Sequence, residues 1–255
     1  MTRLKIISLN LYQGLLSWLI LDYIKSHRDS TAIFCLQEAE PPILAAISPL
    51  LQDSHYLRYE EKPAFRPGVL YRQATFIRKD IDLESSETIL TDNPSTGLAT
   101  NYHLKTTDGM HLALTNFHGV SRPGDKLDNE ARLEQSRKII LSHVKHNLPT
   151  VVLGDFNLLP STRSIAKFED SGYINLIKHF DIPTTRNRLA WDRHPEDRQL
   201  HADYVFMRGI DIGDISFEVE LNEISDHLPL ILTLNLPLTP MANYQDKQAR
   251  LLTTT

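Results

Sequence analysis

The sequence predicts an α/β protein in which two packed β-sheets are covered by helices on their outer faces. Ten short segments have the apolar, β-branched composition of strands, and four helical segments are interspersed among them. Such a mixture fits a layered arrangement, because each apolar face must be buried against another element. No linker or internal repeat divides the chain, so we expect a single domain over residues 1–236.

The predicted strands share short runs of Ile, Val, Leu and Phe bounded by polar or turn residues. In chain order they span residues 4–9, 31–36, 69–71, 74–77, 99–104, 111–117, 150–153, 202–207, 214–219 and 228–236. The predicted helices span residues 15–26, 42–51, 129–145 and 162–171. Along one face of the third helix the spacing lines up four residues, Leu133, Ser136, Ile140 and Val144. After residue 236 the β alternation ends, so residues 237–255 are expected to form a loosely packed or disordered tail.

The composition excludes several classes of protein. Hydrophobic residues make up 41% and charged residues 23% of the chain, which excludes a disordered or collagen-like protein. The single cysteine, Cys35, lies in an apolar run and cannot form an internal disulfide. Neither the N-terminal segment nor residues 15–21 have the length of apolar sequence that predicts a signal peptide or a membrane span. We therefore expect a cytoplasmic protein without stable membrane insertion or an obligate protein partner.

The net charge bears on the partners of the protein. The chain carries a formal charge of -5 at pH 7, and its Lys and Arg residues form no long run. Proteins that hold duplex nucleic acid by its backbone usually present a clustered basic face. The acidic balance argues against that function and suits a site that gathers positive charge from bound metal ions.

Polar side chains stand at the ends of the predicted strands, where they are informative because the strands themselves build the core. They comprise Asn10, Gln37-Glu38, His118, Gly154-Asp155-Phe156-Asn157, Asp203 and Ser225-Asp226-His227. Rigid strands hold such groups at the rim of a cleft while the following loops admit a ligand. Carboxylate and amide oxygens suit a hard cation such as Mg²⁺, whereas Zn²⁺ favours Cys and His. With one cysteine and no helical His pair, magnesium is the better prediction.

Taken in order, these segments resemble the motif series of the endonuclease/exonuclease/phosphatase superfamily. The most specific part is Gly154-Asp155-Phe156-Asn157, followed by Asp203-Tyr204 and Ser225-Asp226-His227. The resemblance spans residues 4–236. It implies a four-layer α/β/β/α sandwich of two mixed sheets, with these residues at one rim, and divalent-metal-dependent hydrolysis of a phosphate ester.

The resemblance assigns the metal ligand to Glu38, with Asn10 and Asp226 beside it. The expected ion is Mg²⁺, with Mn²⁺ as a substitute. A metal on a phosphate oxygen neutralises the charge that builds up in the transition state. Glu38 could instead be a solvated acid at the end of a strand.

Asp155 and Asn157 resemble the pair that orients the attacking water and contacts the phosphate, with Asp155 as the general base. Residues two apart on a strand project to the same side, so both can reach one cleft. The competing interpretation is a Gly-Asp-x-Asn turn, in which Asp and Asn are ordinary turn formers.

Two histidines complete the catalytic set that the resemblance implies. His227 resembles the histidine that contacts the scissile phosphate, and Asp203 the carboxylate that orients it and keeps it cationic. His118 occupies the position of a ring that hydrogen-bonds phosphate. A histidine taken alone is more often structural.

Two loops are expected to choose the substrate. Residues 119–126 carry Arg122 and Lys126, and residues 184–194 carry Arg186, Arg188 and Trp191. The cations are candidates for clasping phosphate, and Trp191 for stacking on a base or sugar. The alternative is a pair of charged, solvated loops.

The sequence thus predicts a metal-dependent phosphoric ester hydrolase acting on a small molecule or on short or single-stranded nucleic acid. Nuclease, phosphodiesterase and phosphatase activities all remain open, because the core motifs are shared and specificity lies in the loops. The alternative from another class is a non-catalytic module that binds a phosphate ligand in the same pocket.

Overall fold

A computed structural model describes residues 2–64, 68–144, 146, 148–192, 195 and 198–236 of the chain. The predicted tail, residues 237–255, lies outside the described residues. Within the described part, the strands form two sheets of six strands each.

The first sheet, sheet A, has the strand order β11-β12-β1-β2-β4-β3. Its strands are β1 (Thr2–Asn10), β2 (Ile33–Gln37), β3 (His55–Pro63), β4 (Leu70–Arg78), β11 (Ile215–Val219) and β12 (Leu230–Leu236). The second sheet, sheet B, has the order β5-β6-β7-β8-β10-β9. Its strands are β5 (Asp82–Ile89), β6 (Leu98–Lys105), β7 (His111–His118), β8 (Thr150–Asp155), β9 (Ile174–Asn175) and β10 (Asp203–Arg208).

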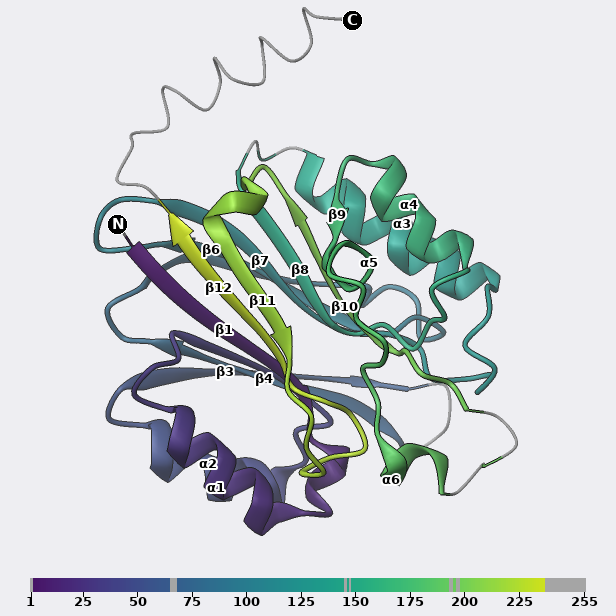
Figure 1. The fold of residues 1–255 in the computed structure, drawn as a ribbon, viewed down its shortest axis with the longest axis horizontal. Helices are drawn as coiled ribbons and strands as arrows, with labels where there is room; N and C mark the ends of the chain where they lie inside the picture. Colours follow the sequence, from purple (N-terminus) through teal and green to yellow (C-terminus); the bar gives the residue numbers. More distant parts are fainter. Residues whose placement is uncertain are drawn as a thin grey trace, which may run out of the picture.

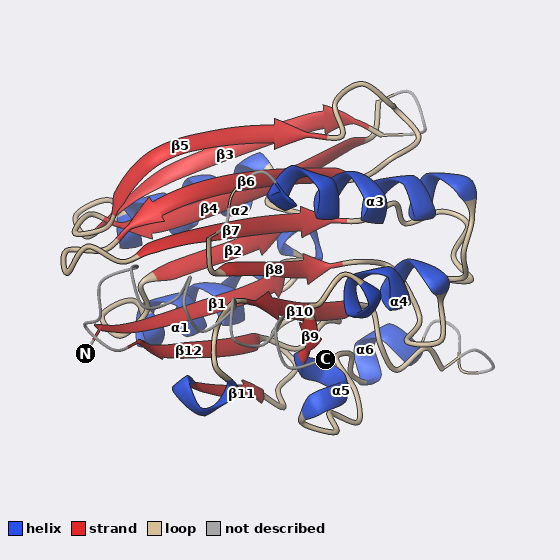
Figure 2. Cartoon of the chain, turned by 90° about the horizontal axis from the view of Figure 1, so that it is seen from above, coloured by secondary structure: helices blue, strands red, loops and turns tan. Residues whose placement is uncertain are grey.

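Helices cover the outer faces of both sheets and complete four layers (Figure 1). They are α1 (Ser17–His27), α2 (Pro41–Leu51), α3 (Glu130–Val144), α4 (Arg163–Asp170), α5 (Leu176–His179) and α6 (Arg188–Trp191), with 3-10 turns at Tyr12–Gly14 and Ile212–Asp214. Helices α1 and α2 pack on sheet A, and α3 and α4 lie on sheet B (Figures 1 and 2). The predicted α/β/β/α sandwich of two mixed sheets is confirmed.

One parallel strand pair lies inside each sheet, and the pairs set the position of the polar residues. In sheet A, β1 runs parallel to β2, and in sheet B, β7 runs parallel to β8. Their carboxyl ends carry Asn10, Glu38, His118 and Asp155. Strands β10 and β12 run antiparallel to these pairs, so their amino-terminal ends reach the same rim. Asp203, for example, pairs directly with Asp155.

Strand alternation decides which polar residues face the space between the sheets. On β1, Ile7 and Leu9 pack outward among the residues of α1 and α2, which leaves Ile6, Ser8 and Asn10 on the inner side. The buried amide of Gln37 on β2 donates to Asn116 Oδ1 of β7 at 2.7 Å. This buried polar contact ties the two sheets together one layer below the rim.

The sequence missed strands at the edges of the sheets. Strand β3 and strand β5 are edge strands rich in charged and hydroxyl residues, and β9 has two residues. An edge strand is half solvated, so it lacks the apolar run on which the predictions relied. The segments 69–71 and 74–77 form one strand, β4, because Arg72 and Gln73 continue the pairing with β3.

The buried face of α3 differs from the predicted one. Val144 is 61% exposed, whereas Arg132, Gln135, Ile139 and His143 are fully buried. The prediction followed apolar spacing, but this helix buries polar side chains that find partners in the loops and strands beneath it. Ser136 and Ile140 do lie on the buried side.

His143 anchors the carboxyl end of α3 through a directional chain of hydrogen bonds. Asn101 Nδ2 donates to Ser142 Oγ at 2.9 Å, and Thr115 Oγ1 donates to Asn101 Oδ1 at 2.7 Å. The hydroxyl proton of Thr115 is thereby used, so His143 Nε2, 2.7 Å away, is the donor to it. His143 Nδ1 has no partner within the described residues, and burial lowers the pKa of this imidazole to about 3.

His143 therefore makes stability depend on pH in acid. The unfolded chain binds the proton near pH 6.5 and the folded protein only near pH 3, so stability falls as the pH drops below 6.5. At pH 5 the loss from this residue is about 2 kcal/mol. The free energy of unfolding, measured with urea, should fall less between pH 7 and pH 5 in His143→Gln than in wild type. The glutamine keeps a donor to Thr115. The exposed His179→Gln is the control, and an equal loss in H143Q and wild type would exclude this role.

Candidate active site

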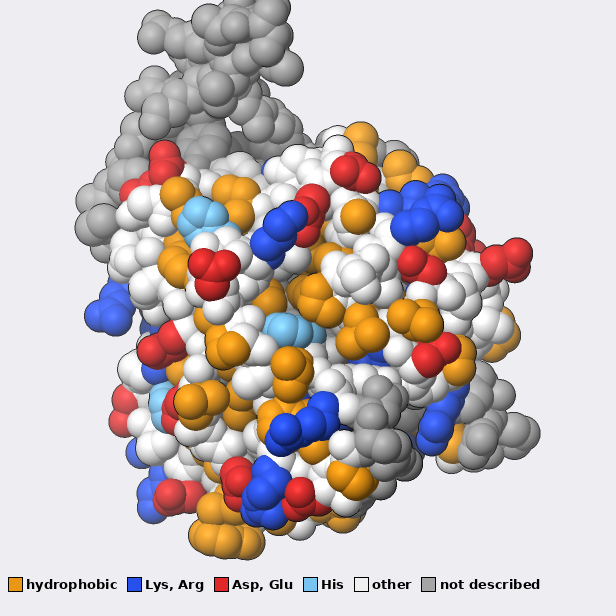
Figure 3. All heavy atoms as spheres, turned by 45° about the vertical axis from the view of Figure 1, so that its right-hand side comes forward, with side chains coloured by type: hydrophobic (Ala, Val, Ile, Leu, Met, Phe, Trp, Pro, Cys, Tyr) orange, Lys and Arg blue, Asp and Glu red, His pale blue; other side chains and the backbone are white. Residues whose placement is uncertain are grey.

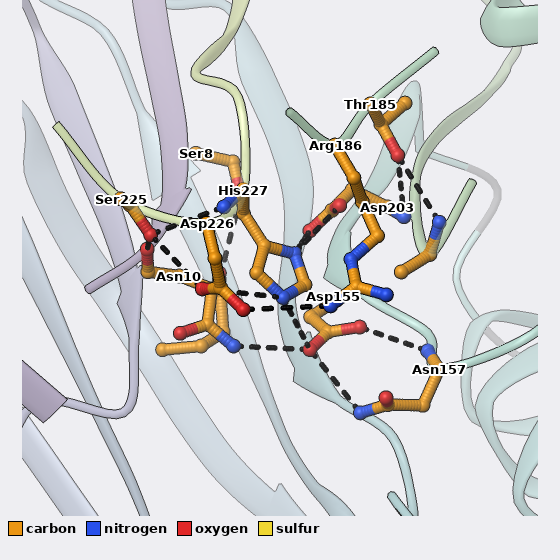
Figure 4. Close-up of polar contacts among 12 residues, drawn as sticks. Ser8, Asn10, Asp155, Asn157, Thr185, Arg186, Asp203, Ser225, Asp226 and His227 are labelled. Carbon is orange, nitrogen blue, oxygen red and sulfur yellow. Dashed lines mark hydrogen bonds and ion pairs between the residues drawn. The ribbon is translucent and has the colours of Figure 1, made fainter. Parts of the chain in front are cut away.

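The centre of the site is the side chain of Asn10, which touches residues from both sheets (Figure 4). Asn10 Nδ2 donates to Glu38 Oε1 at 3.2 Å and to Asp155 Oδ2 at 3.0 Å. The Ser225 hydroxyl donates to the backbone carbonyl of Asn10 at 2.6 Å, which brings the Asp226-His227 segment to the same place. Three segments that are distant in the sequence, those of Glu38, Asp155 and Ser225, thus meet at Asn10.

Glu38 and Asp226 form one side of the site, which we call the acidic half. Burial raises the pKa of Glu38, the positive charge of His227 and the hydrogen bond from Asn10 lower it, and the nearby carboxylates of Asp226 and Asp155 raise it, so that the pKa is about 7. Asn10 is its side-chain hydrogen-bond donor. Among the described residues Glu38 has no ion-pair partner, whereas Asp226 pairs with Arg186, and carboxylate oxygens such as that of Glu38 suit Mg²⁺ or Mn²⁺.

His227 and Asp203 form a buried pair beside this half. His227 Nδ1 lies 2.8 and 3.0 Å from the two oxygens of Asp203. Although burial alone lowers the pKa of His227, the carboxylates of Asp203, Asp226 and Asp155 raise it to about 9. The ring is therefore a cation at neutral pH, and its Nε2 faces Asp155 and Asp226 at 3.9 Å each.

Asp155 and Asn157 reach one point by a turn. Asn157 has φ 54° and its backbone N–H donates to Asp155 Oδ1 at 2.9 Å, while its Nδ2 donates to Asp155 Oδ2 at 3.1 Å. The expectation that Asp155 and Asn157 project from the same face of one strand is wrong, because β8 ends at Asp155 and Asn157 lies in the following turn. Gly154 permits the close packing before the turn, since a Cβ there would lie 2.0 Å from the Phe117 carbonyl oxygen.

The charge on Asp155 is stabilised from several sides. Burial raises the pKa of this carboxyl, but the positive charges of His227 and Lys126 are the main causes that hold the pKa below its ordinary value. Asp155 is therefore ionised at neutral pH. His118 Nε2 lies 3.9 Å away, and burial lowers the pKa of His118 to about 4, so this ring is neutral at neutral pH.

Two of the five predicted substrate-binding side chains approach this cluster. Lys126 Nζ donates to Asn157 Oδ1 at 2.5 Å, and Arg186 lies 3.4 Å from Asp226 Oδ2. Arg188 is exposed and paired with Glu223 and Asp192. Arg122 is exposed on its loop, and Trp191 is half-buried on α6. Trp191, Arg186 and Arg188 together line a shallow groove beside the site.

Sequence reasoning missed the residues that shape the loop carrying Lys126. Arg132 is fully buried, and its guanidinium donates to Asp125 Oδ1 at 2.9 Å and to the carbonyls of Leu127 and Pro123. Gln135 Oε1 accepts from the backbone N–H groups of Gly97 and Val120 at 3.2 and 3.3 Å. The available signal was the i, i+3 spacing of Arg132 and Gln135, which places two polar side chains on one helix face.

Comparison with known proteins agrees with this geometry. Residues 7–227 match the model of the endonuclease/exonuclease/phosphatase family. The chain belongs to this family. No curated protein matches the chain.

Solved structures of the family share the fold with this chain at low sequence identity. The catalytic domain of human Nocturnin with bound sulfate is 19% identical with a TM-score of 0.70, covering 91% of this chain and 93% of Nocturnin. A humanized TDP2 of D. rerio is 18% identical with a TM-score of 0.67, covering 92% and 99% of the two chains. The mannosyl-6-phosphatase Bt3783 of Bacteroides thetaiotaomicron is 18% identical with a TM-score of 0.65, covering 90% and 98%.

In the described part of the chain, no helix combines the length and apolarity that a membrane-spanning helix requires.

The acidic half of the site predicts the effect of neutralising Glu38. Glu38→Gln should raise the Kd for Mn²⁺ and the Mg²⁺ concentration needed for activity by at least about tenfold, because an amide oxygen is a poorer ligand for a hard cation. Calorimetric titration with Mn²⁺ measures this without substrate. Glu87→Gln on the exposed face of β5 is the matched control, and an unchanged titration of E38Q would remove Glu38 from the metal site.

Proposed function

We propose that this protein is a divalent-metal-dependent hydrolase that cleaves a phosphate ester with an activated water. The observation that carries the proposal is that Asn10 Nδ2 joins Glu38 and Asp155 at 3.2 and 3.0 Å, while the His227 cation lies 3.9 Å from the same oxygen of Asp155. The family's name, which covers nucleases and phosphatases, supports the same class of reaction.

In this proposal Asp155 is the general base. The attacking water lies between Asp155 and the phosphorus, and it passes one proton to the carboxylate as its oxygen forms the new P–O bond. The bond to the ester oxygen breaks, and the leaving oxygen takes up a proton from solvent. Asn157 and Asn10 hold the carboxylate by hydrogen bonds, so Asp155 keeps one orientation while it accepts the proton.

In this proposal, cationic groups stabilise the negative charge that develops on the phosphate. The Nε2–H of His227 points into the site and donates to a nonbridging phosphate oxygen, while Asp203 fixes the ring through Nδ1. A divalent ion held by Glu38, with Asn10 and Asp226 beside it, would neutralise the phosphate and stabilise the leaving oxygen. His118 is the neutral ring that donates to the phosphate.

Arg186 and the groove beside it are proposed to hold the rest of the substrate. Arg186 lies 3.4 Å from Asp226 Oδ2 and lines the groove, and the several N–H donors of its guanidinium suit a phosphate oxygen. Trp191 and Arg188 line the groove that continues from Arg186, and a base or sugar fits against the indole. Arg122 stands on the loop at the other side and is proposed to contact a longer substrate.

A small or single-stranded phosphate ester fits this surface better than duplex DNA. On the face shown in Figure 3, Lys and Arg side chains stand in separate groups with Asp and Glu between them. With a formal charge of -5 on the chain, little of the counterion release that drives duplex binding is available. The cytoplasmic location and the preference for Mg²⁺ over Mn²⁺ stay predictions.

A non-catalytic phosphate-binding module is the alternative from another class. Such a module has no need to retain Asp155 as an ionised base facing a cationic His227, and this chain keeps both groups. Hydrolysis of a generic aryl phosphodiester with and without EDTA separates the two functions. Turnover that EDTA abolishes supports the hydrolase, and phosphate binding without any turnover supports the module.

Removal of the base or of the cationic ring should abolish most of the rate. Asp155→Asn and His227→Ala should each lower kcat by a factor on the order of a hundred or more. Circular dichroism checks the fold, with the exposed Asp29→Asn and His179→Ala as controls. Near wild-type kcat in either active-site variant would rule out the role assigned to it.

The same kinetics test Asp203 through a double variant. Because Asp203 acts on the reaction through His227, D203N combined with H227A should be much less impaired than the product of the two single effects. Independent, multiplicative losses would contradict this pairing.

Substrate preference is tested by competition at equal phosphate concentration. Mononucleotides or short single strands should compete better than long duplex DNA, and the preference should depend weakly on salt. The measurement follows hydrolysis of the aryl diester with each competitor across rising salt. Should duplex DNA win with a steep salt dependence, a nuclease acting on duplex DNA becomes the better account.

A further inference from the structure

We propose that the ammonium group of Lys126 takes the place of a second metal ion, so that the site works with one divalent ion, beside Glu38. This inference rests on the proposed hydrolysis. It concerns the half of the site that contains Asp155 and Asn157, which we call the lysine half, as distinct from the acidic half around Glu38.

Asn10 separates the two halves. Its Nδ2 stands between Glu38 Oε1 at 3.2 Å and Asp155 Oδ2 at 3.0 Å. On one side Asp226 pairs with Arg186 at 3.4 Å, whereas Glu38 has no cationic side chain within ion-pair distance among the described residues. On the other side Lys126 Nζ lies against Asn157 at 2.5 Å. The lysine half therefore contains a built-in ammonium group, whereas Glu38 in the acidic half has no ion-pair partner among the described residues.

The donor atoms of the lysine half are already engaged. Asp155, Asp203 and His227 bring one ligand atom each within 4.8 Å of one another, which has the composition of a metal site. However, both oxygens of Asp203 face His227 Nδ1. Asp155 accepts from Asn10 and twice from Asn157.

Asn157 is turned against metal binding as well. Its Nδ2, which is no metal ligand, faces Asp155, and its Oδ1 faces Lys126. A second ion would have to displace these hydrogen bonds and approach an ammonium group at close range, which is unfavourable in a buried site.

Lys126 is held in place by burial and by the hydrogen bonds of its loop. Its side chain is buried, its backbone has φ 56°, and its carbonyl accepts from the Leu159 N–H at 2.9 Å. The buried guanidinium of Arg132 binds residues on both sides of it, Asp125 and Leu127. A charge that is held in place before the substrate arrives stabilises the transition state without reorganisation.

Metal stoichiometry tests the inference without catalysis. Calorimetry and the electron paramagnetic resonance of free Mn²⁺ should find one bound ion per wild-type chain. At the Mn²⁺ concentration that saturates wild type, Glu38→Gln should bind none. Two ions on the wild-type chain, with one retained by E38Q, would overturn the inference. An absence of both Mn²⁺ binding and hydrolysis in the wild type would instead reject the proposed function.

Removal of the ammonium group provides the second test. Lys126→Ala should still bind one Mn²⁺ at equal or higher affinity, while kcat falls on the order of a hundredfold. Ethylammonium added to K126A should restore at least about tenfold of that loss, because the alanine leaves room for a small cation. The exposed Lys25→Ala is the control. Its Mn²⁺ binding and kcat should equal those of wild type, and ethylammonium should not change its kcat.

The outcomes separate a charge from a merely structural side chain. A kcat for K126A within about threefold of wild type, or a large loss without any rescue by ethylammonium, would overturn the inference. Should K126A fail to fold, Lys126→Met keeps the buried stem, and its Mn²⁺ stoichiometry and kcat decide the question.

Discussion

The amide of Asn10 is the contact on which the site depends. It is the place where the two sheets meet at the rim, since its Nδ2 donates both to Glu38 of sheet A and to Asp155 of sheet B. Two carboxylates buried this close repel each other unless a donor stands between them. A neutral amide does so without supplying charge, and Glu38 keeps no ion-pair partner among the described residues. The side chain of Asn10 thus both links the two carboxylates and keeps them apart.

The convergence of the remaining residues is a property of the sheet topology. Each sheet places one parallel strand pair at its centre, and the neighbouring strands run in the opposite direction. Carboxyl ends of two strands and the amino end of a third therefore share a rim in both sheets. Helix α3 adds the last component, because its buried Arg132 and Gln135 shape the loop that carries Lys126. The stability of that helix against sheet B and the position of the lysine are thus linked.

Burial acts differently on each ionisable group of the site, according to its neighbours. Low polarity raises the pKa of Glu38, where carboxylates surround it, and lowers the pKa of His118, which has little compensating charge. His227 is equally buried, yet three carboxylates keep it cationic. One environment therefore holds a carboxyl group with a raised pKa, a neutral ring and a charged ring within a few ångströms.

The sequence by itself determined the fold class, the central strands and the identity of the motif residues. Runs such as Val151–Leu153 are apolar on both faces, and a run of that kind can be read locally. Only the tertiary structure decided the edge strands β3 and β5, which are half solvated, and the turn that brings Asn157 to Asp155. It also separated Lys126 and Arg186, which enter the site, from Arg188, which pairs with acids at the surface. All are basic residues in polar loops, and their difference lies in long-range partners that no local pattern encodes.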